Sequence, residues 1–288
     1  MDERAALADL ADRLPDAGDD CAVVDGQVIT TDMLHERTDF PTGTTRYTAG
    51  WRAVAASLSD VAAMGGEATA AVAAYGAPSF DAEELAAFVD GAQDVCHAVG
   101  AEYVGGDLDS HDEFTVATTA IGSTPDPVRR SGASPGDAVC VTGTLGRSAA
   151  ALELFDRGDT NQANELFQFE PRVRAGVALR PHATAMMDSS DGLARSLHQL
   201  AEASGCGFAI EEPLPIDAQV DTLAETPQER RELGVFFGED FELVCTLPES
   251  DVPEARAAVP CSLYRIGTAT GNGVTLDGEA LPDRGYSH

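Results

Sequence analysis

Residues 184–197 read TAMMDSSDGLARSL, and the fold assignment starts from this stretch. An apolar run that ends at Asp188 is typical of a buried strand, and the apolar residues of the segment 191–204 return at helical spacing. Two aspartates and two serines occupy the junction between strand and helix. Asp188 and both serines are good helix N-caps, but a helix needs only one. The junction therefore has spare oxygen acceptors, which predicts a binding role in addition to capping.

Strands and helices alternate along the whole chain. Strands are expected at 21–24, 27–30, 69–76, 102–107, 114–122, 138–143, 183–188, 208–212, 241–247 and 262–267, with a small hairpin at 273–283. Helices are expected at 7–14, 47–64, 81–100, 145–158, 171–180, 191–204 and 249–259. This order is not a strict βαβ repeat, which favours an α+β fold made of two α/β domains.

A segment rich in Pro, Gly and Ser at 125–137 is the best linker candidate. We therefore expect an N-terminal domain at residues 1–128, with a mixed sheet and helices. We expect a C-terminal α/β domain at residues 129–288.

The charge balance excludes several functions. The chain has 49 acidic and 18 basic residues, and every basic residue is Arg. A net charge of -31 repels nucleic acid and anionic membranes, so neither is an expected partner. Such an excess of carboxylates without Lys resembles proteins of salt-loving archaea, where molar salt screens charges within about 3 Å. Most of these carboxylates are expected to be solvated surface.

Cysteines and hydropathy indicate a cytoplasmic protein. The six cysteines lie far apart and form no C-x-x-C pair, so neither a metal cluster nor a redox motif is supported. No apolar run approaches the ~20 residues that a membrane span requires, and the N-terminus is acidic rather than a basic signal region.

Several carboxylates do not fit a solvated surface. If the turn at residues 25–26 closes a hairpin, Asp20 lies opposite Thr31 and Asp19 lies opposite Asp32. Like charges that face each other across a ladder destabilise it, so either a cation lies between them or the strand ends separate in solvent. Asp60 lies within a helical segment of small apolar residues, where a buried N–H acceptor and a metal ligand are equally consistent roles.

Further acidic residues follow apolar runs in both halves of the chain. Asp107 follows two glycines that allow a ligand close to the backbone, and Glu239 and Asp240 precede the strand expected at 241–247. Carboxylates at several strand ends suggest one acidic cleft. Such a cleft binds phosphates through Mg²⁺, because oxygen ligands without a His or Cys cluster favour hard cations.

The phosphate chemistry is restricted by the absence of Lys. It excludes a P-loop and the lysine of protein kinases. The glycine-containing turn VTGTLGRS at 141–148 offers backbone N–H groups to a phosphate, although many helix starts contain such a turn for structural reasons. Arg130 is a better positive group, because its planar fork suits phosphate. The histidines share no motif, so covalent catalysis is not indicated.

The ordered motifs resemble the thiamine-monophosphate kinase family, within the aminoimidazole ribotide synthetase superfamily. The motifs are GDDCAVV (18–24), ITTDML (29–34), SLSDVAAMGG (57–66), YVGGD (103–107), RRSGASPGD (129–137), VTGTLG (141–146), MDSSDGL (187–193) and FGEDFEL (237–243). The resemblance spans residues 18–285. The superfamily shares single motifs, whereas the ordered set is specific.

The resemblance implies a homodimer in which the N-terminal domains form a joint barrel, and transfer of phosphate from ATP to thiamine monophosphate. It implies several Mg²⁺ ions, held by Asp20, Thr30, Thr31, Asp32, Asp60, Asp107, Asp188 and Asp191. It implies ATP contacts at Gly106, Asp107, Arg130 and Ser190, and a substrate contact at Glu239.

Two positions depart from the family pattern. Bacterial members commonly have His before a Phe where this chain has Asp39 before Phe40. A carboxylate at this position still suits the cationic thiazolium ring. The aromatic residue expected near the C-terminus is absent, Asp283 stands near its place, and Tyr286 is the nearest ring.

The implied reaction needs no acid or base from the protein, because the accepting phosphate oxygen is already ionised near pH 7. Magnesium and Arg130 would instead stabilise charge. Two alternatives stay open at the level of sequence: a ligase resembling aminoimidazole ribotide synthetase, and a nucleotide-binding regulator without turnover. A selenophosphate synthetase does not fit, since no glycine-rich arm precedes Cys21.

Overall fold

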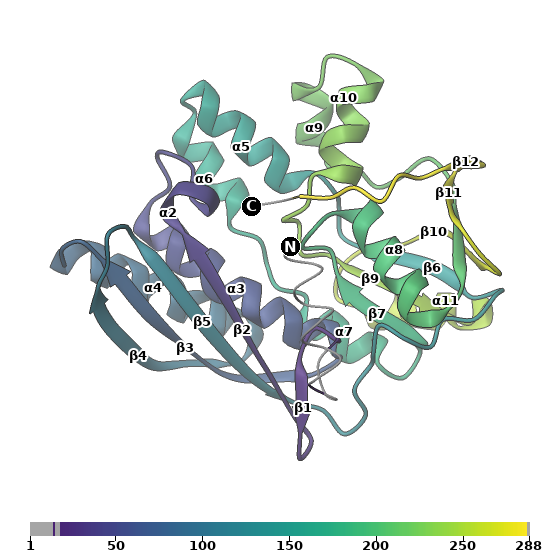
Figure 1. Cartoon of the computed structure of the whole chain (residues 1–288), viewed down its shortest axis with the longest axis horizontal. Helices are drawn as coiled ribbons and strands as arrows, with labels where there is room; N and C mark the ends of the chain where they lie inside the picture. Colours follow the sequence, from purple (N-terminus) through teal and green to yellow (C-terminus); the bar gives the residue numbers. More distant parts are fainter. Residues whose placement is uncertain (1–13, 15–17, 287–288) are drawn as a thin grey trace.

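The computed structural model describes residue 14 and residues 18–286. Two sheets lie side by side, one in each half of the molecule (Figure 1). This arrangement of mixed sheets and helices confirms the predicted α+β class. The helix expected at 7–14 lies outside the described residues, apart from Leu14. No helix in the described part of the chain is both long and apolar enough to cross a membrane.

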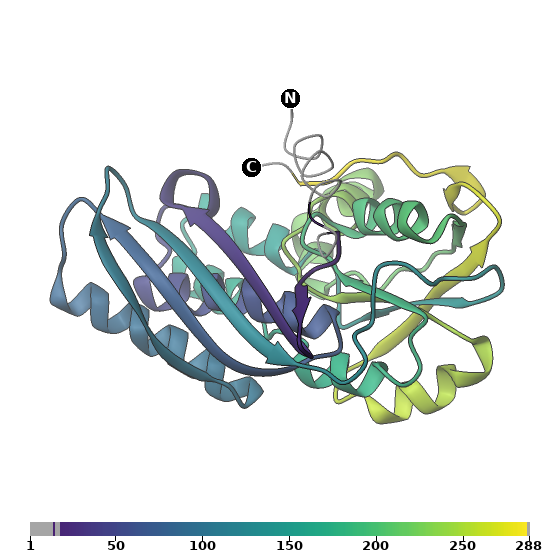
Figure 2. The same ribbon diagram turned by 60° about the horizontal axis from the view of Figure 1, so that its bottom comes forward.

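The first sheet has five strands in the order β1-β2-β5-β3-β4. Its strands are β1 (Ala22–Val24), β2 (Gln27–His35), β3 (Glu67–Ala77), β4 (Glu102–Ser110) and β5 (Thr115–Ser123). Only β3 and β4 are parallel, because α4 (Ala82–Val99) connects them as a crossover. Helix α3 (Arg46–Ala63) and α4 lie along one face of the sheet, as Figure 2 shows, and the short α2 (Glu36–Asp39) follows β2.

Helices α3 and α4 pack unusually closely, because a glycine from each lies at the crossing. A methyl group on Gly91 of α4 would come 2.0 Å from the carbonyl oxygen of Tyr47. A methyl group on Gly50 of α3 would come 2.1 Å from the carbonyl oxygen of Phe88. Both distances are far below van der Waals contact, so the crossing tolerates only glycine. Close packing brings α3 against the sheet along its length.

The second sheet has seven strands in the order β12-β11-β8-β10-β6-β9-β7. Its strands are β6 (Ala138–Thr142), β7 (Ala185–Asp188), β8 (Gly207–Ile210), β9 (Leu243–Leu247), β10 (Leu263–Thr270), β11 (Val274–Leu276) and β12 (Glu279–Ala280). The helices are α5 (Arg147–Arg157), α6 (Thr160–Phe167), α7 (Val173–Leu179), α8 (Leu193–Ser204), α9 (Ala218–Leu223), α10 (Pro227–Arg231) and α11 (Val252–Ala258), with a π-helical turn η1 (Glu232–Phe236) and a 3₁₀ turn η2 (Glu249–Asp251).

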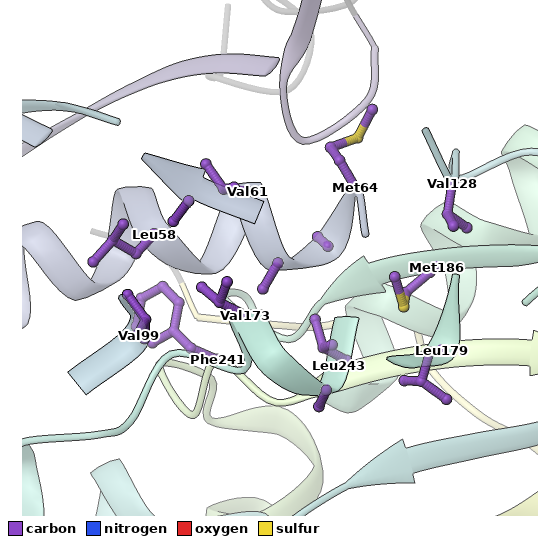
Figure 3. Packing of buried hydrophobic residues seen from close by; sticks show 14 of the residues in the cluster. Leu58, Val61, Met64, Val99, Val128, Val173, Leu179, Met186, Phe241 and Leu243 are labelled. Carbon is purple, nitrogen blue, oxygen red and sulfur yellow. The ribbon is translucent and has the colours of Figure 1, made fainter. Parts of the chain in front are cut away.

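One hydrophobic core joins the two halves. It contains Leu58 and Val61 from α3, Val173 from α7, and Met186 and Leu243 from the second sheet, all buried (Figure 3). Helix α3 therefore belongs to both halves: one side packs on the first sheet and another side packs on α7 and β7. The boundary expected between residues 128 and 129 lies between β5 and β6, and it stays a prediction.

The hairpin prediction is partly wrong. The turn register is as expected, with Val24 opposite Gln27, but the ladder between β1 and β2 ends at Ala22 and Ile29. Asp19 and Asp20 precede β1 and do not pair with β2. The other edge of β2 pairs with β5 along its whole length. The chain leaves the ladder before β1 because Asp19 and Asp20 bond to Arg129 and Arg130 instead of to β2. The sequence interpretation also missed α2, α6, α9, α10 and η1, which are short, each with eight residues or fewer.

Replacing Gly91 by Ala tests the helix crossing. We expect Gly91→Ala to lower the free energy of unfolding by about 1–3 kcal/mol, as overpacking does, although Ala favours helices. Denaturant unfolding in molar KCl measures the change. Gly271→Ala is the matched control, because a methyl group there meets nothing within 4 Å. A Gly91→Ala protein as stable as the control would show that the helices separate freely.

Candidate active site

Three carboxylates from distant parts of the chain converge at the junction of the two halves. Asp20 precedes β1, Asp60 lies in the last turn of α3, and Asp188 ends β7. One oxygen of each lies within 4.8 Å of the others. The end of a helix carries a partial negative charge, so the position of Asp60 is itself unfavourable for an acid. These three residues are called the carboxylate cluster below.

Each member of the carboxylate cluster is held by a polar side chain. The Ser59 hydroxyl donates to Asp188 Oδ2 at 2.7 Å, and the Thr30 hydroxyl donates to Asp60 Oδ2. Arg130 donates to both oxygens of Asp20, from Nη2 at 2.9 Å and from Nε at 3.2 Å. Asp19 supports this fork from behind, since it accepts the backbone N–H of Arg130 at 2.9 Å and an N–H of Arg129 at 2.6 Å.

Burial and neighbouring charges make Asp60 and Asp188 hold protons more tightly than ordinary acids. Burial, followed by the charges of Asp32, Asp188 and Asp20, raises the pKa of Asp60 well above its usual value. Burial and Asp20 also raise the pKa of Asp188, although Ser59 and Arg130 oppose the shift. Burial works to lower the pKa of Arg130, but pairing with Asp20 raises it overall, so the guanidinium stays charged.

Asp32 lies beside the carboxylate cluster on the helix-covered face of the first sheet. Its Oδ2 accepts the Ser57 hydroxyl at 2.6 Å, and Ser57 also contacts the Thr118 hydroxyl at 2.7 Å. Burial and the charge of Glu239 raise the pKa of Asp32. Thr31 points to the opposite face, where its exposed hydroxyl donates to the Thr118 carbonyl. The arrangement is a set of oxygen donors, which hard divalent cations prefer.

The loop after β7 does not cap α8 with a side chain, so the expected serine cap is wrong. The N-cap of α8 is Gly192, with φ 97° and no side-chain hydrogen bond. Ser189 is fully buried, and its hydroxyl has no partner among the described residues. Ser190 and Asp191 are half-buried, and their carbonyls accept the N–H groups of Glu239 and Tyr286. The backbone of this loop is thus hydrogen-bonded to Glu239 and Tyr286, whose surroundings are described next.

Glu239, Asp39 and Tyr286 form a second group next to Asp32. Glu239 is held by Arg52, whose Nη2 lies 2.8 Å from Glu239 Oε2. Asp39 is buried, and its Oδ2 accepts the His35 N–H and the Thr38 hydroxyl, each at 2.7 Å. The Tyr286 ring lies 5.1 Å from that of Phe237. Burial and the charges of Glu239 and Asp39 raise the pKa of Tyr286. The sequence-predicted substrate residues therefore lie near enough for their charges to affect one another.

Gly106 and Asp107 lie away from the carboxylate cluster within one chain. The ladder runs from Asp107 through Ala74 and Ala117 to Met33, so Asp107 shares the outer face of the sheet with Met33. Three strand spacings correspond to about 14 Å. Asp107 and Asp32 thus face opposite sides. Both Gly106 and Asp107 border a cavity of about 700 Å³ between β4 and α4, whose apolar walls include Phe88.

The expected phosphate cradle at 141–148 already holds an acid of the protein itself. Asp240 accepts the N–H of Gly146 at 2.6 Å and the N–H of Ser148 at 3.0 Å. Burial raises the pKa of Asp240 to about 7, and these two N–H groups oppose the shift. The start of α5 is therefore an internal anchor for the loop that contains Glu239, and the cradle interpretation is wrong.

Sequence reasoning missed the residues that hold the acids. Arg52, Ser57 and Ser59 all lie on α3 and all bond to a predicted site residue. One signal existed: Arg52 and Ser59 are seven residues apart, which places them on one helix face, in a segment otherwise made of small apolar residues. An arginine among such residues has no solvent-facing neighbours and needs an internal partner.

Fold and site together define a protein of the AIR synthase related class. The N-terminal domain of these proteins matches residues 18–124, and their C-terminal domain matches residues 134–278. Within this class the chain belongs to the thiamine-monophosphate kinase family. It is 65% identical to the thiamine-monophosphate kinase of Halobacterium salinarum, with both chains covered completely, and 44% identical to that of Methanospirillum hungatei, with 94% of this chain and 92% of that protein covered.

A solved structure agrees along the whole chain. The structure of AaThiL complexed with AMPPCP and TMP superposes with a TM-score of 0.89 at 28% identity, covering 99% of this chain and 96% of that one. The likeness extends across both sheets, so the arrangement of the two halves is shared as well as each half.

Replacing Asp60 by Asn tests the repulsion within the carboxylate cluster. Without divalent metal, we expect Asp60→Asn to raise the free energy of unfolding by on the order of 2 kcal/mol at pH 8, because one buried charge disappears. The folded-state pKa of Asp60 is raised, so the penalty develops as pH rises above its ordinary value and the gain shrinks towards pH 5. Denaturant unfolding with a chelator at fixed KCl measures both values.

Asp90→Asn is the control, since Asp90 is exposed on α4, lies outside the cluster and is not among the predicted metal ligands. Added Mg²⁺ should stabilise the wild type and the control but have little effect on Asp60→Asn. Equal Mg²⁺ responses in all three proteins would count against a metal site at the cluster.

Proposed function

We propose that this chain transfers a phosphate from ATP to thiamine monophosphate, giving thiamine diphosphate and ADP, with Mg²⁺ as the metal. One observation carries the proposal: three acids from separate segments, one of them fully buried, converge within 4.8 Å in a chain that is 65% identical to a thiamine-monophosphate kinase. Buried like charges are costly, so a cation accounts for their convergence. We also propose that the protein works in the cytoplasm.

The proposed metal set begins with the carboxylate cluster and Asp32, and Thr30 supports it. Thr31 would contribute only a main-chain oxygen, because its side chain faces the other side of the sheet. Asp191 and Asp107 complete the predicted set. Bound Mg²⁺ would neutralise the phosphates and hold them in line. Oxygen donors without His or Cys fit this ion, which binds a few carboxylates together with phosphate oxygens.

The chain's own groups position the reactants and stabilise charge. Arg130 is half-buried against Asp20 and stays protonated, so it would supply a fixed positive charge beside the phosphates. No side chain is needed as a general base, because the accepting phosphate oxygen is ionised near neutral pH. Ser190 is the proposed second ATP contact on this side.

The acceptor side suits a cation. Glu239 and Asp39 are carboxylates, and Tyr286 adds a ring beside Phe237. The thiazolium ring carries a positive charge, so two acids and an aromatic face are the groups that bind it. Asp39 also closes the turn before α2 through its bonds to His35 and Thr38, which fixes the orientation of its carboxylate.

We propose that the ATP site is completed by a second copy of the chain. Arg130 and Ser190 lie at the carboxylate cluster, whereas Gly106 and Asp107 lie three strands away on β4. The cavity bordered by Gly106 and Asp107 has apolar walls suited to a nucleoside base. Pairing between the outer faces of two first sheets would also cover Met33, which is 62% exposed.

An assay of product formation tests the activity. In molar KCl with ATP, Mg²⁺ and thiamine monophosphate, we expect thiamine diphosphate and ADP in equal amounts, detected by chromatography. Asp60→Asn should lower the rate by at least 100-fold, because it removes a metal ligand. Gly271→Ala should retain wild-type activity. Absence of thiamine diphosphate from the wild type across a range of salt concentrations would refute the proposed function.

A mixing experiment tests the second copy. Asp60→Asn and Asp107→Asn should each be nearly inactive alone. If each site uses Asp60 of one copy and Asp107 of the other, mixed dimers contain one intact site, and statistical mixing restores about a quarter of wild-type activity. Light scattering should give the mass of a dimer. No recovery after subunit exchange, with exchange verified by a tag, would place all ligands of one site within one chain.

A further inference from the structure

Arg52 is a fully buried charge in the middle of α3. Its side chain is 1% exposed. Nη1 donates to the Phe167 carbonyl at 2.8 Å. Nη2 points to three acceptors: Glu239 Oε2 at 2.8 Å, the Glu239 carbonyl at 3.1 Å and the Ser148 hydroxyl at 3.2 Å. The guanidinium thus connects a helix of the first half to the glutamate loop of the second.

Aromatic rings enclose the guanidinium. Its carbon lies 3.6 Å from the ring centroid of Phe167, 5.3 Å from that of Phe169 and 5.6 Å from that of Phe241. Rings attract a flat cation through their faces and exclude solvent, so they fix the plane of the fork. Nε has no hydrogen-bond partner among the described residues. A buried cation with an unsatisfied N–H is costly, which favours a role beyond stability.

The backbone of Glu239 is held in an uncommon conformation. Its φ is 64°, in the left-handed region that non-glycine residues seldom adopt. Two further bonds hold it there: the Glu239 N–H donates to the Ser190 carbonyl, and the Ser148 hydroxyl donates to the Glu239 carbonyl, each at 2.5 Å. Arg52 binds both the carbonyl and the carboxylate of the same residue, so it fixes backbone and side chain together.

Glu239 lies between the two functional groups of the site. Its charge acts on Asp32 on the metal side and on Tyr286 on the acceptor side. One carboxylate oxygen is bound to Arg52, and no hydrogen bond to the other, Oε1, is found in the described part of the chain. The carboxylate is 13% exposed. A single oxygen with a fixed direction therefore remains for a ligand.

We propose that Arg52 is a positioning residue that holds Glu239 Oε1 towards the phosphate acceptor, and so sets the position of the acceptor relative to the carboxylate cluster. The inference rests on the proposed function. Arg52 does not contact the acceptor; it acts through Glu239. A planar fork is required, because one nitrogen must bind the Glu239 carboxylate and carbonyl while the other binds Phe167. Lysine has the charge but offers only one nitrogen.

Kinetics with each substrate varied separately tests the role. We expect Arg52→Lys to raise the KM for thiamine monophosphate about 10-fold, because the Glu239 carboxylate loses its fixed direction, while the KM for ATP changes less than about 2-fold. Arg52→Gln should have a larger effect of the same kind. The double variant Arg52→Gln with Glu239→Gln should be no worse than the more impaired single variant, since both changes remove one interaction.

Arg172 provides the matched control. It also forms a buried pair with a glutamate of the same segment, donating to both oxygens of Glu242 at 2.6 and 2.7 Å. Arg172→Lys should lower the thermal midpoint as much as Arg52→Lys, without separating the two KM values. If Arg52→Gln does not fold, Arg52→Lys and Glu239→Gln carry the comparison, and calorimetric binding of thiamine monophosphate should weaken about 10-fold in both.

The outcomes separate the two proposals. An inactive wild type refutes the proposed function. An active wild type whose Arg52→Lys variant keeps its KM for thiamine monophosphate, or whose two KM values rise together as in Arg172→Lys, refutes the positioning role and leaves the proposed function intact. The positioning role is also refuted if the effects of Arg52→Gln and Glu239→Gln on the KM for thiamine monophosphate multiply in the double variant.

Discussion

The structure depends on the mutual repulsion of Asp20, Asp60 and Asp188. The three acids converge within 4.8 Å, and burial with neighbouring charges raises the pKa of Asp60 and Asp188, so their ionised forms oppose folding unless a positive charge lies nearby. Arg130 supplies part of this charge by binding Asp20 with both arms of its fork. The remaining imbalance is what makes the site fit a divalent cation. A cluster of acids of this kind opposes folding when no cation is bound, and the surrounding core supplies the stability.

Helix α3 supplies much of that support and most of the geometry. Its glycine crossing with α4 brings it close to the first sheet, and its other side packs in the core shared with β7 and β9. From this one helix Ser57 holds Asp32, Ser59 holds Asp188, and Arg52 holds Glu239. The same helix therefore holds both Asp188 and Glu239. The distance between these two carboxylates is set by the geometry of α3 rather than by flexible loops.

Local patterns predicted the elements well where the chemistry is local. The turn at residues 25–26 and the periods of α3, α4 and α8 appeared as expected. Predictions of side-chain partners failed where the partner lies far away in the sequence. Asp20 binds Arg130 instead of facing Thr31, and Asp240 occupies the helix start that looked open to phosphate. Both acids follow the positive partner that burial offers, which no spacing rule reveals.

The sequence by itself determined the class of fold, the acidic character, the exclusion of lysine-dependent phosphate sites and a set of candidate acids, because periodicity and composition act over short distances. Only the tertiary structure decided which acids meet. Asp20, Asp60 and Asp188 lie 40 to 168 residues apart, and Asp107 faces the other side of its sheet. Convergence of this kind depends on strand order and on helix packing, and both follow from the burial of the whole core rather than from any local pattern.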